Sequence, residues 1–251
     1  MLMVEPDRTP YDLQFHVAGI PIRVHPFFWL ASAFLAVRPE LRLVDLLLWI
    51  AVVFVSIVVH ELGHAFAFRR YGTHSHIVLY TFGGLAIPDS SGRLNTPWRR
   101  MFVALAGPVA GFLFAGLVAI GILALGRKTP LFLPFFEPFY LGWGEPIRSV
   151  PLMRVLNNLI YVNLFWGVVN LLPVYPLDGG QFFREVLSLQ NPRDGLRQSL
   201  LLSILTAGGI ALVAYARFND FYLALMFAYL GYLSFQMLQS LGGYGGGWHG
   251  R

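Results

Sequence analysis

The pattern of apolar and polar positions divides the chain into long apolar runs separated by short polar or proline- and glycine-rich segments. A helix that crosses a bilayer needs about 20 consecutive, mostly apolar residues. Five runs reach that length, and a sixth is shorter and follows Pro21 and Pro26. The pattern therefore predicts about six transmembrane helices, at 26–37, 43–68, 101–126, 152–172, 198–217 and 219–241.

The segments between these runs carry other signals. Residues 74–87 (HSHIVLYTFGGLAI) are β-branched and aromatic around a glycine pair, which predicts a strand, a turn and a second strand. Residues 17–24 are expected to be extended. The apolar segment 131–147 is interrupted by three prolines and fits either a re-entrant or an interfacial loop. The glycine-rich tail, 242–251, is expected to be disordered.

The composition supports a membrane protein. Apolar residues make up 56% of the chain and charged residues only 12%, whereas soluble domains carry about 25% charged residues. The predicted fold class is therefore an all-α polytopic membrane protein with a small membrane-associated β-hairpin. We expect one domain over residues 1–251, with an N-terminal cytoplasmic segment (1–25), a transmembrane core (26–241) and the flexible tail (242–251).

Charge and cysteine content restrict the chemistry and the partners. The chain has no cysteine, so disulfides and thiolate metal sites are excluded. The formal net charge of +5 fits arginines that flank the spans and face anionic lipid, and no nucleic-acid partner is expected. With six spans, 11 basic residues lie on the side of the two termini and 7 on the other. The positive-inside rule then places both termini in the cytoplasm. The N-terminus lacks the pattern of a signal peptide.

The second predicted span contains His60-Glu61-Leu62-Gly63-His64. Residues four apart lie on one face of a helix, so His60 and His64 can bind one metal ion, while Glu61 can reach a water molecule on that ion. The alternative is a set of ordinary polar residues near a helix end. Ionisable groups inside a span are costly unless they are paired or coordinate a metal, so the context favours a metal site.

A hydrolytic zinc site needs a third protein ligand, and the best candidate is Asp178. It follows two prolines at the end of the fourth predicted span and precedes Gly179 and Gly180. The alternative is that Asp178, together with Gln181, caps a helix at 179–188. Asn170 is a candidate oxyanion donor, while inter-helix hydrogen bonding explains Asn157, Asn158 and Asn163 more simply.

HELGH in one span and NLLPVYPLDGG at the end of a later one together resemble the site-2 protease family of intramembrane metalloproteases. The resemblance implies one zinc ion held by His60, His64 and Asp178, and catalytic roles for Glu61 and Asn170. Family members look similar around FGGLA, where an exposed strand edge could bind substrate, at Gly83 and Gly84, by addition of a β-strand. The alternative is that residues 77–86 form a purely structural hairpin. Position 111 is glycine where the family often has asparagine. The chain is similar to the membrane core without a PDZ or CBS domain.

The expected activity is hydrolysis of peptide bonds within or near the bilayer, with transmembrane proteins or leftover signal peptides as substrates. One alternative is a zinc-binding membrane scaffold that does not cleave. Another is a metal transporter, for which His74 and His76 could form an entry pair. The sequence does not identify the substrate or the oligomeric state, and a His₂Asp site also accepts other divalent ions.

Overall fold

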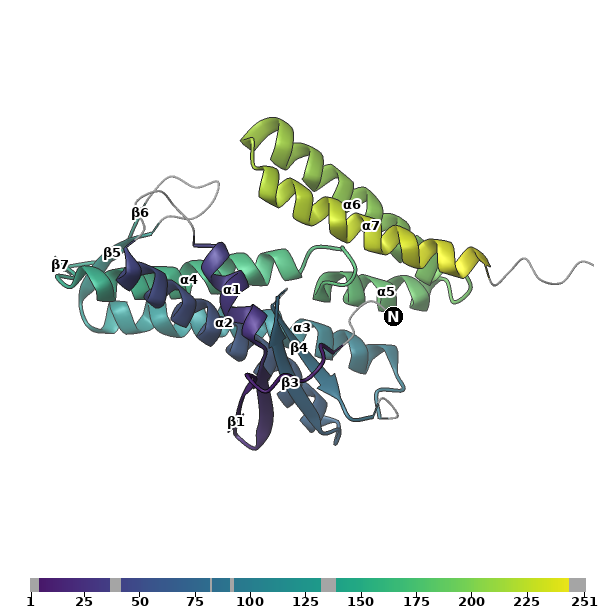
Figure 1. Ribbon diagram of the computed structural model, residues 1–251, viewed down its shortest axis with the longest axis horizontal. Coiled ribbons are helices and arrows are strands. Elements are labelled where there is room, and N and C mark those ends of the chain that lie inside the picture. The colour runs from purple at the N-terminus through teal and green to yellow at the C-terminus, as the bar shows by residue number, and fades with distance from the viewer. Residues whose placement is uncertain (1–4, 37–41, 82, 91–92, 132–138, 244–251) are drawn as a thin grey trace, which may run out of the picture. The chain divides into compact units, whose positions relative to one another are not determined.

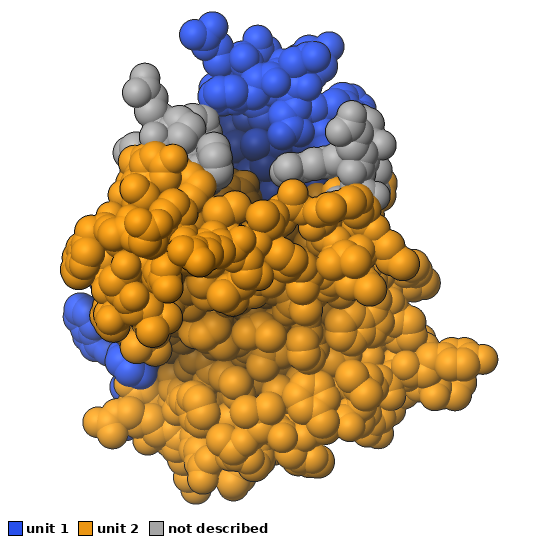
Figure 2. Space-filling model, turned by 90° about the vertical axis from the view of Figure 1, so that its left-hand side faces the viewer, with its two compact units in different colours: residues 1–4, 94–105, 169–251 blue, residues 5–93, 106–168 orange. Residues whose placement is uncertain are grey.

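The computed structural model describes residues 5–36, 42–81, 83–90, 93–131 and 139–243. Two compact units share the chain (Figure 2). Unit 2 contains residues 5–93 and 106–168, and unit 1 contains residues 94–105 and 169–251 along with the first four residues.

Unit 2 contains a four-stranded sheet in the order β1-β2-β3-β4. The strands are β1 (Leu13–Val17), β2 (Ile20–Val24), β3 (Ser75–Tyr80) and β4 (Gly83–Pro88) (Figure 1). The two hairpins are antiparallel, and β2 pairs with β3 in parallel, with Ile22 opposite Ile77. The predicted strand-turn-strand at 74–87 is thus confirmed, and the predicted extended segment at 17–24 is confirmed over 20–24, while Ala18 and Gly19 form the turn between β1 and β2. β4 is the edge strand of the sheet.

Side chains alternate between the two faces of this sheet, and one face is buried. Val24, Ile77 and Leu79 have no exposed surface and belong to a cluster that also includes Val53 and Ile57 of helix α2. On the other face, Arg23 is buried because two carboxylates of the N-terminal segment surround it: Glu5 and Asp12 each lie 2.8 Å from its guanidinium. The sheet is therefore fixed against α2 on one side and against the N-terminal segment on the other.

Two helices of unit 2 precede β3. Helix α1 (Pro26–Phe34) begins with a proline at its first position, and His25 caps it through a hydrogen bond from the Phe27 amide. Helix α2 (Leu43–Arg70) is about 42 Å long at 1.5 Å per residue. The indole of Trp49 donates to the Ser32 carbonyl, and the rings of Phe28 and Phe54 are in contact. The two helices therefore run antiparallel.

The rest of unit 2 comes from most of helices α3 (Pro97–Ala124) and α4 (Val150–Asn170) and the small sheet between them. The first part of α3, up to residue 105, and the last two residues of α4 belong to unit 1. That sheet has the order β6-β5-β7, with β5 (Arg127–Leu131), β6 (Phe139–Gly142) and β7 (Glu145–Pro146). The Asn163 amide donates to the Ser56 hydroxyl at 2.9 Å, and the Asn157 amide donates to the Pro130 carbonyl at 2.7 Å. Asn163 thus makes the predicted inter-helix hydrogen bond, whereas Asn157 bonds to strand β5 and not to another helix.

Unit 1 contains helices α5 (Asp178–Gln190), α6 (Gly195–Phe218) and α7 (Phe221–Gly243). Helices α6 and α7 form an antiparallel pair (Figure 1), whose connection is made by Asn219 in the left-handed conformation. Val174, Ala207 and Phe227 form the buried centre of this unit. The predicted C-terminal tail lies mostly outside the described residues, since α7 continues to Gly243.

Five helices in the described part of the chain are long and apolar enough to cross a membrane: α2, α3, α4, α6 and α7. They correspond to the five long predicted spans. The short predicted span at 26–37 is instead the nine-residue helix α1, about 13 Å long, well below the roughly 30 Å of a bilayer core. Strands occupy the described part of 131–147, and residues 132–138 lie outside the described residues.

Candidate metal centre

The HELGH motif lies within the C-terminal half of α2, and its three ionisable side chains are buried. His60, Glu61 and His64 are 3%, 5% and 7% exposed. Their spacing on a regular helix places the two imidazoles on one face, and their Nε2 atoms lie 3.2 Å apart. The two rings are nearly perpendicular, with centroids 5.0 Å apart. Both Nε2 atoms therefore converge on one point.

Glycines of α2 and α3 make room for these imidazoles. A Cβ at Gly107 would lie 2.2 Å from His64 Nε2 and 2.7 Å from His60 Nε2. A Cβ at Gly63 would lie 2.4 Å from the Ala106 carbonyl oxygen. Helices approach this closely only where side chains are very small. Gly107 and Gly111 are four residues apart, a spacing that permits close helix packing, and Gly107 borders the histidine pair.

Asp178 is the first residue of α5 and is 8% exposed. The residue before it, Leu177, is the N-cap and makes no side-chain capping bond. The side chain of Gln181 donates to the Pro176 carbonyl instead of closing a capping box. The capping interpretation of Asp178 and Gln181 is therefore wrong, and α5 is slightly longer than the expected helix at 179–188.

Two glycines fix the start of α5. A Cβ at Gly179 would lie 2.2 Å from the Leu171 carbonyl oxygen, and one at Gly180 would lie 2.4 Å from the Tyr175 nitrogen. The helix thus packs directly on the backbone of the preceding loop, which the absence of side chains at these two glycines permits. No larger residue fits at either position without a shift of the loop.

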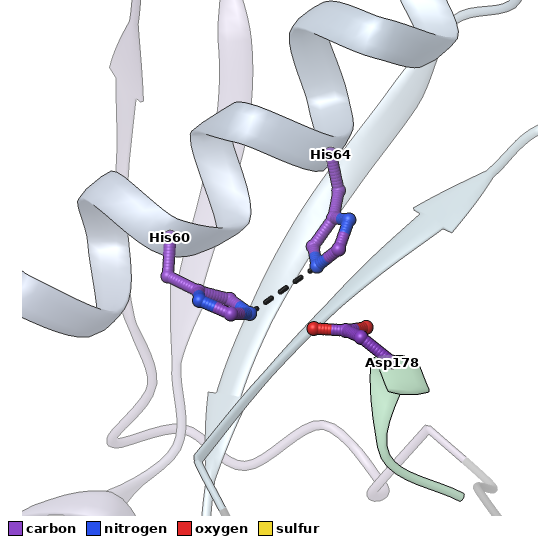
Figure 3. Close-up of side chains that lie close together, drawn as sticks. All are labelled: His60, His64 and Asp178. Carbon is purple, nitrogen blue, oxygen red and sulfur yellow. Dashed lines mark hydrogen bonds between the residues drawn. The ribbon is translucent and has the colours of Figure 1, made fainter. Parts of the chain in front are cut away.

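The ligand atoms of His60, His64 and Asp178 all lie within 4.8 Å of one another (Figure 3). This is the group of potential metal ligands found in the described part of the chain. Two nitrogen ligands of a tetrahedral zinc ion are about 3.3 Å apart, because each bond is about 2.0–2.1 Å long. The observed 3.2 Å between the Nε2 atoms matches that separation. Two imidazoles and one carboxylate are also a common donor set for zinc, so these residues fit the ion.

The edge strand β4 lies directly against Glu61. A Cβ at Gly84 would be 2.4 Å from Glu61 Cγ and 2.7 Å from Oε1. The neighbouring Gly83 has a φ of +117°, which disfavours other residues, and a Cβ there would be 2.9 Å from the Trp166 ring. The backbone of β4 therefore passes beside the Glu61 carboxylate, with no side chain between them.

The predicted asparagine, Asn170, is the last residue of α4 and is 7% exposed. Gly111, where the family often has asparagine, lies next to an asparagine of α4. A Cβ at Gly111 would lie 3.4 Å from the Oδ1 atom of Asn163, so an amide from α4 borders the space beside this glycine.

Within unit 1, α5 is held by a buried ion pair. The guanidinium of Arg100 lies 2.7 Å from Glu185, which is seven residues beyond Asp178 and 5% exposed. Arg184 also donates to Glu185 at 3.0 Å. Burial alone would raise the pKa of Glu185, but the hydrogen bonds from the two arginines outweigh it and lower the pKa. The Glu185 carboxylate is thus negatively charged, and its ion pair with Arg100 holds α5 against the start of α3.

Comparison with known proteins identifies the class of protein. The model of peptidase family M50 matches residues 48–214, which is more than half of the chain. The chain therefore belongs to peptidase family M50, in agreement with the resemblance carried by the two motifs. The matched region begins in α2 and ends in α6, so it contains both motifs. With its five apolar helices, the chain is an integral membrane protein.

Several individual proteins are similar to this chain. A zinc metalloprotease of Methanocaldococcus jannaschii is 33% identical over 179 residues, which are 69% of this chain and 44% of that protein. Stage IV sporulation protein FB of Bacillus subtilis is 28% identical over 74% of this chain and 56% of its own length. The chain thus spans about half the length of these two relatives.

One solved structure shares the fold. The site-2 protease from Methanocaldococcus jannaschii matches with a TM-score of 0.58, and the match covers 91% of this chain and 95% of that one. The two sequences are 23% identical, so the likeness establishes a common fold.

Proposed function

We propose that this protein is a zinc metalloprotease that hydrolyses peptide bonds of membrane-spanning substrates. The observation that carries the proposal is the convergence of three buried ligand atoms, from His60, His64 and Asp178, within 4.8 Å. Buried ionisable groups in an apolar span persist when they are paired or coordinate a metal. Family membership and the zinc metalloprotease among the relatives support the same reading.

Each residue has a separate task in the proposed reaction. A zinc ion held by these three residues would supply a Lewis acid and would make the attacking water more acidic. Glu61 takes a proton from the attacking water onto a carboxylate oxygen, and then gives it to the amide nitrogen as the C–N bond breaks. The Asn170 amide donates a hydrogen bond to the oxygen of the tetrahedral intermediate. Two products result, with a new carboxylate and a new amine.

The edge strand β4 is the proposed substrate-binding element. Its outer edge is not paired with another strand of its sheet, so it can accept an extended peptide by β-addition. The close approach of Gly84 to Glu61 would then bring the scissile carbonyl next to the general base. A helical substrate must unwind before it can bind in this way, which fits substrates that are single-span proteins or leftover signal peptides.

The pairing of β2 with β3 supports the proposed topology. The two strands lie side by side, so they belong to the same side of the membrane, although α2 lies between them in the sequence. If α2 crosses once, β2 and the start of α2 lie on opposite sides of the membrane, and α1 runs antiparallel to α2. Four further spans follow α2. Both termini then lie on one side, which the distribution of basic residues assigns to the cytoplasm.

The test uses purified protein reconstituted in liposomes with fluorescently labelled single-span proteins and signal peptides. We expect the wild type to cleave some of them, and Glu61→Gln to retain zinc but to lose cleavage. Retained turnover in Glu61→Gln would remove Glu61 from the mechanism. A wild type that binds zinc but cleaves no substrate would favour a non-catalytic scaffold.

A further inference from the structure

The loop that leads to Asp178 is held by two serines from different helices. The amide of Tyr175 donates to the hydroxyl of Ser203 on α6 at 3.0 Å. The hydroxyl of Ser234 on α7 donates to the Tyr175 carbonyl at 3.0 Å. Both polar groups of a single backbone residue are therefore satisfied by side chains of the α6–α7 pair.

Both serines are almost completely buried. Ser203 is 1% exposed and Ser234 is fully buried, in helices that are otherwise largely apolar. The Ser203 hydroxyl donates its proton to the Ser199 carbonyl of its own helix, which leaves its oxygen free to accept from the Tyr175 amide. The single hydroxyl proton of Ser234 is shared between the Tyr175 carbonyl and the Leu230 carbonyl, each 3.0 Å from its oxygen.

Tyr175 is coupled to Asp178 through a short, internally bonded segment. The Leu177 amide donates to the Val174 carbonyl at 2.8 Å, and the Gln181 amide donates to the Leu177 carbonyl at 3.0 Å. Gly180 packs against the Tyr175 backbone, where a Cβ would be 2.4 Å from the nitrogen. A displacement of Tyr175 therefore moves the start of α5 and its first residue, Asp178.

We propose that Ser203 and Ser234 are positioning residues for the third metal ligand, and that the helix pair α6–α7 holds Asp178 in place through them. The inference rests on the proposed zinc site. It gives α6 and α7 a role beyond spanning the membrane: they set the position of the loop that carries the carboxylate. Removing a residue that orients a metal ligand typically weakens metal binding about 10- to 100-fold.

The experiment compares Ser203→Ala, Ser234→Ala and the double variant with the wild type. The rate at which each zinc-loaded protein loses metal to a chromogenic chelator is measured, together with the d–d absorption of the cobalt-loaded proteins. Ser199→Ala is the matched control, because Ser199 is also buried in α6, at 4% exposed, and its hydroxyl donates to the Leu196 carbonyl of its own helix. Ser234→Thr restores the hydroxyl and serves as the conservative variant.

We expect zinc release to be about 10- to 100-fold faster in the alanine variants, with an altered cobalt spectrum. Ser199→Ala and Ser234→Thr should behave like the wild type. Equal release rates and spectra in all the serine variants would overturn the inference while leaving the zinc site intact. A similar loss in Ser199→Ala would also overturn it, since the effect would then follow from helix stability. A wild type that binds no metal would refute the proposed function and this inference together.

Discussion

Gly107 of α3 lies so close to His64 of α2 that a Cβ at position 107 would be 2.2 Å from the Nε2 atom of the imidazole. Real side chains do not approach so closely, so alanine at this position forces the histidine pair apart. The separation of 3.2 Å between the two Nε2 atoms, which matches the spacing of ligands on one zinc ion, therefore depends on this glycine.

Gly107→Ala should accordingly lose zinc although it changes no ligand. Metal content by elemental analysis is the measurement. Gly116→Ala is the matched control, because Gly116 lies on the same helix with nothing within 4 Å of its Cβ position. Alanine in a helix is favoured over glycine by about 1 kcal/mol, so the control should be at least as stable as the wild type. Equal zinc content in Gly107→Ala and Gly116→Ala would contradict the prediction.

Gly84→Ala should separate metal binding from turnover. The added Cβ would be 2.4–2.7 Å from the Glu61 side chain, and its three nearest atoms all belong to Glu61, so it displaces the general base. We expect zinc to remain and cleavage to fall by at least about tenfold, since general acid–base catalysis contributes roughly 10²–10⁴-fold. Parallel measurement of zinc content and cleavage in liposomes checks this. Unchanged cleavage would show that Glu61 tolerates the crowding.

The sequence predicted the chemistry of the site better than its surroundings. Residues four apart on a helix must share a face, so the placement of His60 and His64 followed from local geometry. Asp178 required long-range information, and its identification rested on the pairing of two motifs. The contacts of Gly107, Ser203 and Ser234 depend on helix packing, and neither spacing nor residue type signals them.

The short span predicted at 26–37 shows a second kind of feature that the sequence could not predict. Pro21 and Pro26 indicated a break before it, but hydropathy alone did not show that helix α1 would end at Phe34. Its relation to the membrane depends on the parallel pairing of β2 with β3, a contact between segments more than fifty residues apart. Pairing of that range has no local signature in the sequence.

Asn163→Ala should destabilise the protein without changing its metal content. The amide donates to Ser56, and both side chains are 2% exposed, so the substitution leaves the serine hydroxyl without this partner. Such bonds between membrane helices contribute about 1 kcal/mol. The midpoint of thermal unfolding in detergent should fall, and zinc per chain should stay the same. Loss of zinc would instead assign Asn163 a role at the metal site.

The lowered pKa of Asp12, in the N-terminal segment, should make the stability of the folded protein depend on pH. Burial alone would raise its pKa, but hydrogen bonds from Thr9 and Arg23 outweigh that effect and lower the pKa to about 2. A carboxylate whose pKa is lower in the folded state stabilises the fold above the unfolded pKa, which is about 3.9. That stabilisation is lost as the pH falls from about 4 to about 2.

Asp12→Asn should therefore be less stable than the wild type at neutral pH, by about 1–2 kcal/mol. The difference between the two proteins should shrink as the pH falls from about 4 to about 2. Thermal unfolding midpoints over this range provide the measurement. A difference that is independent of pH would show that the interaction of Asp12 with Arg23 does not depend on the charge of the carboxylate.

The zinc content of purified wild type beside Asp178→Ala tests the central claim most directly. Elemental analysis of detergent-purified protein should give about one zinc per chain in the wild type and much less in the variant, because the third ligand is removed. An unchanged zinc content in Asp178→Ala would contradict the three-ligand site, and absence of metal from both proteins would contradict the proposed metalloprotease.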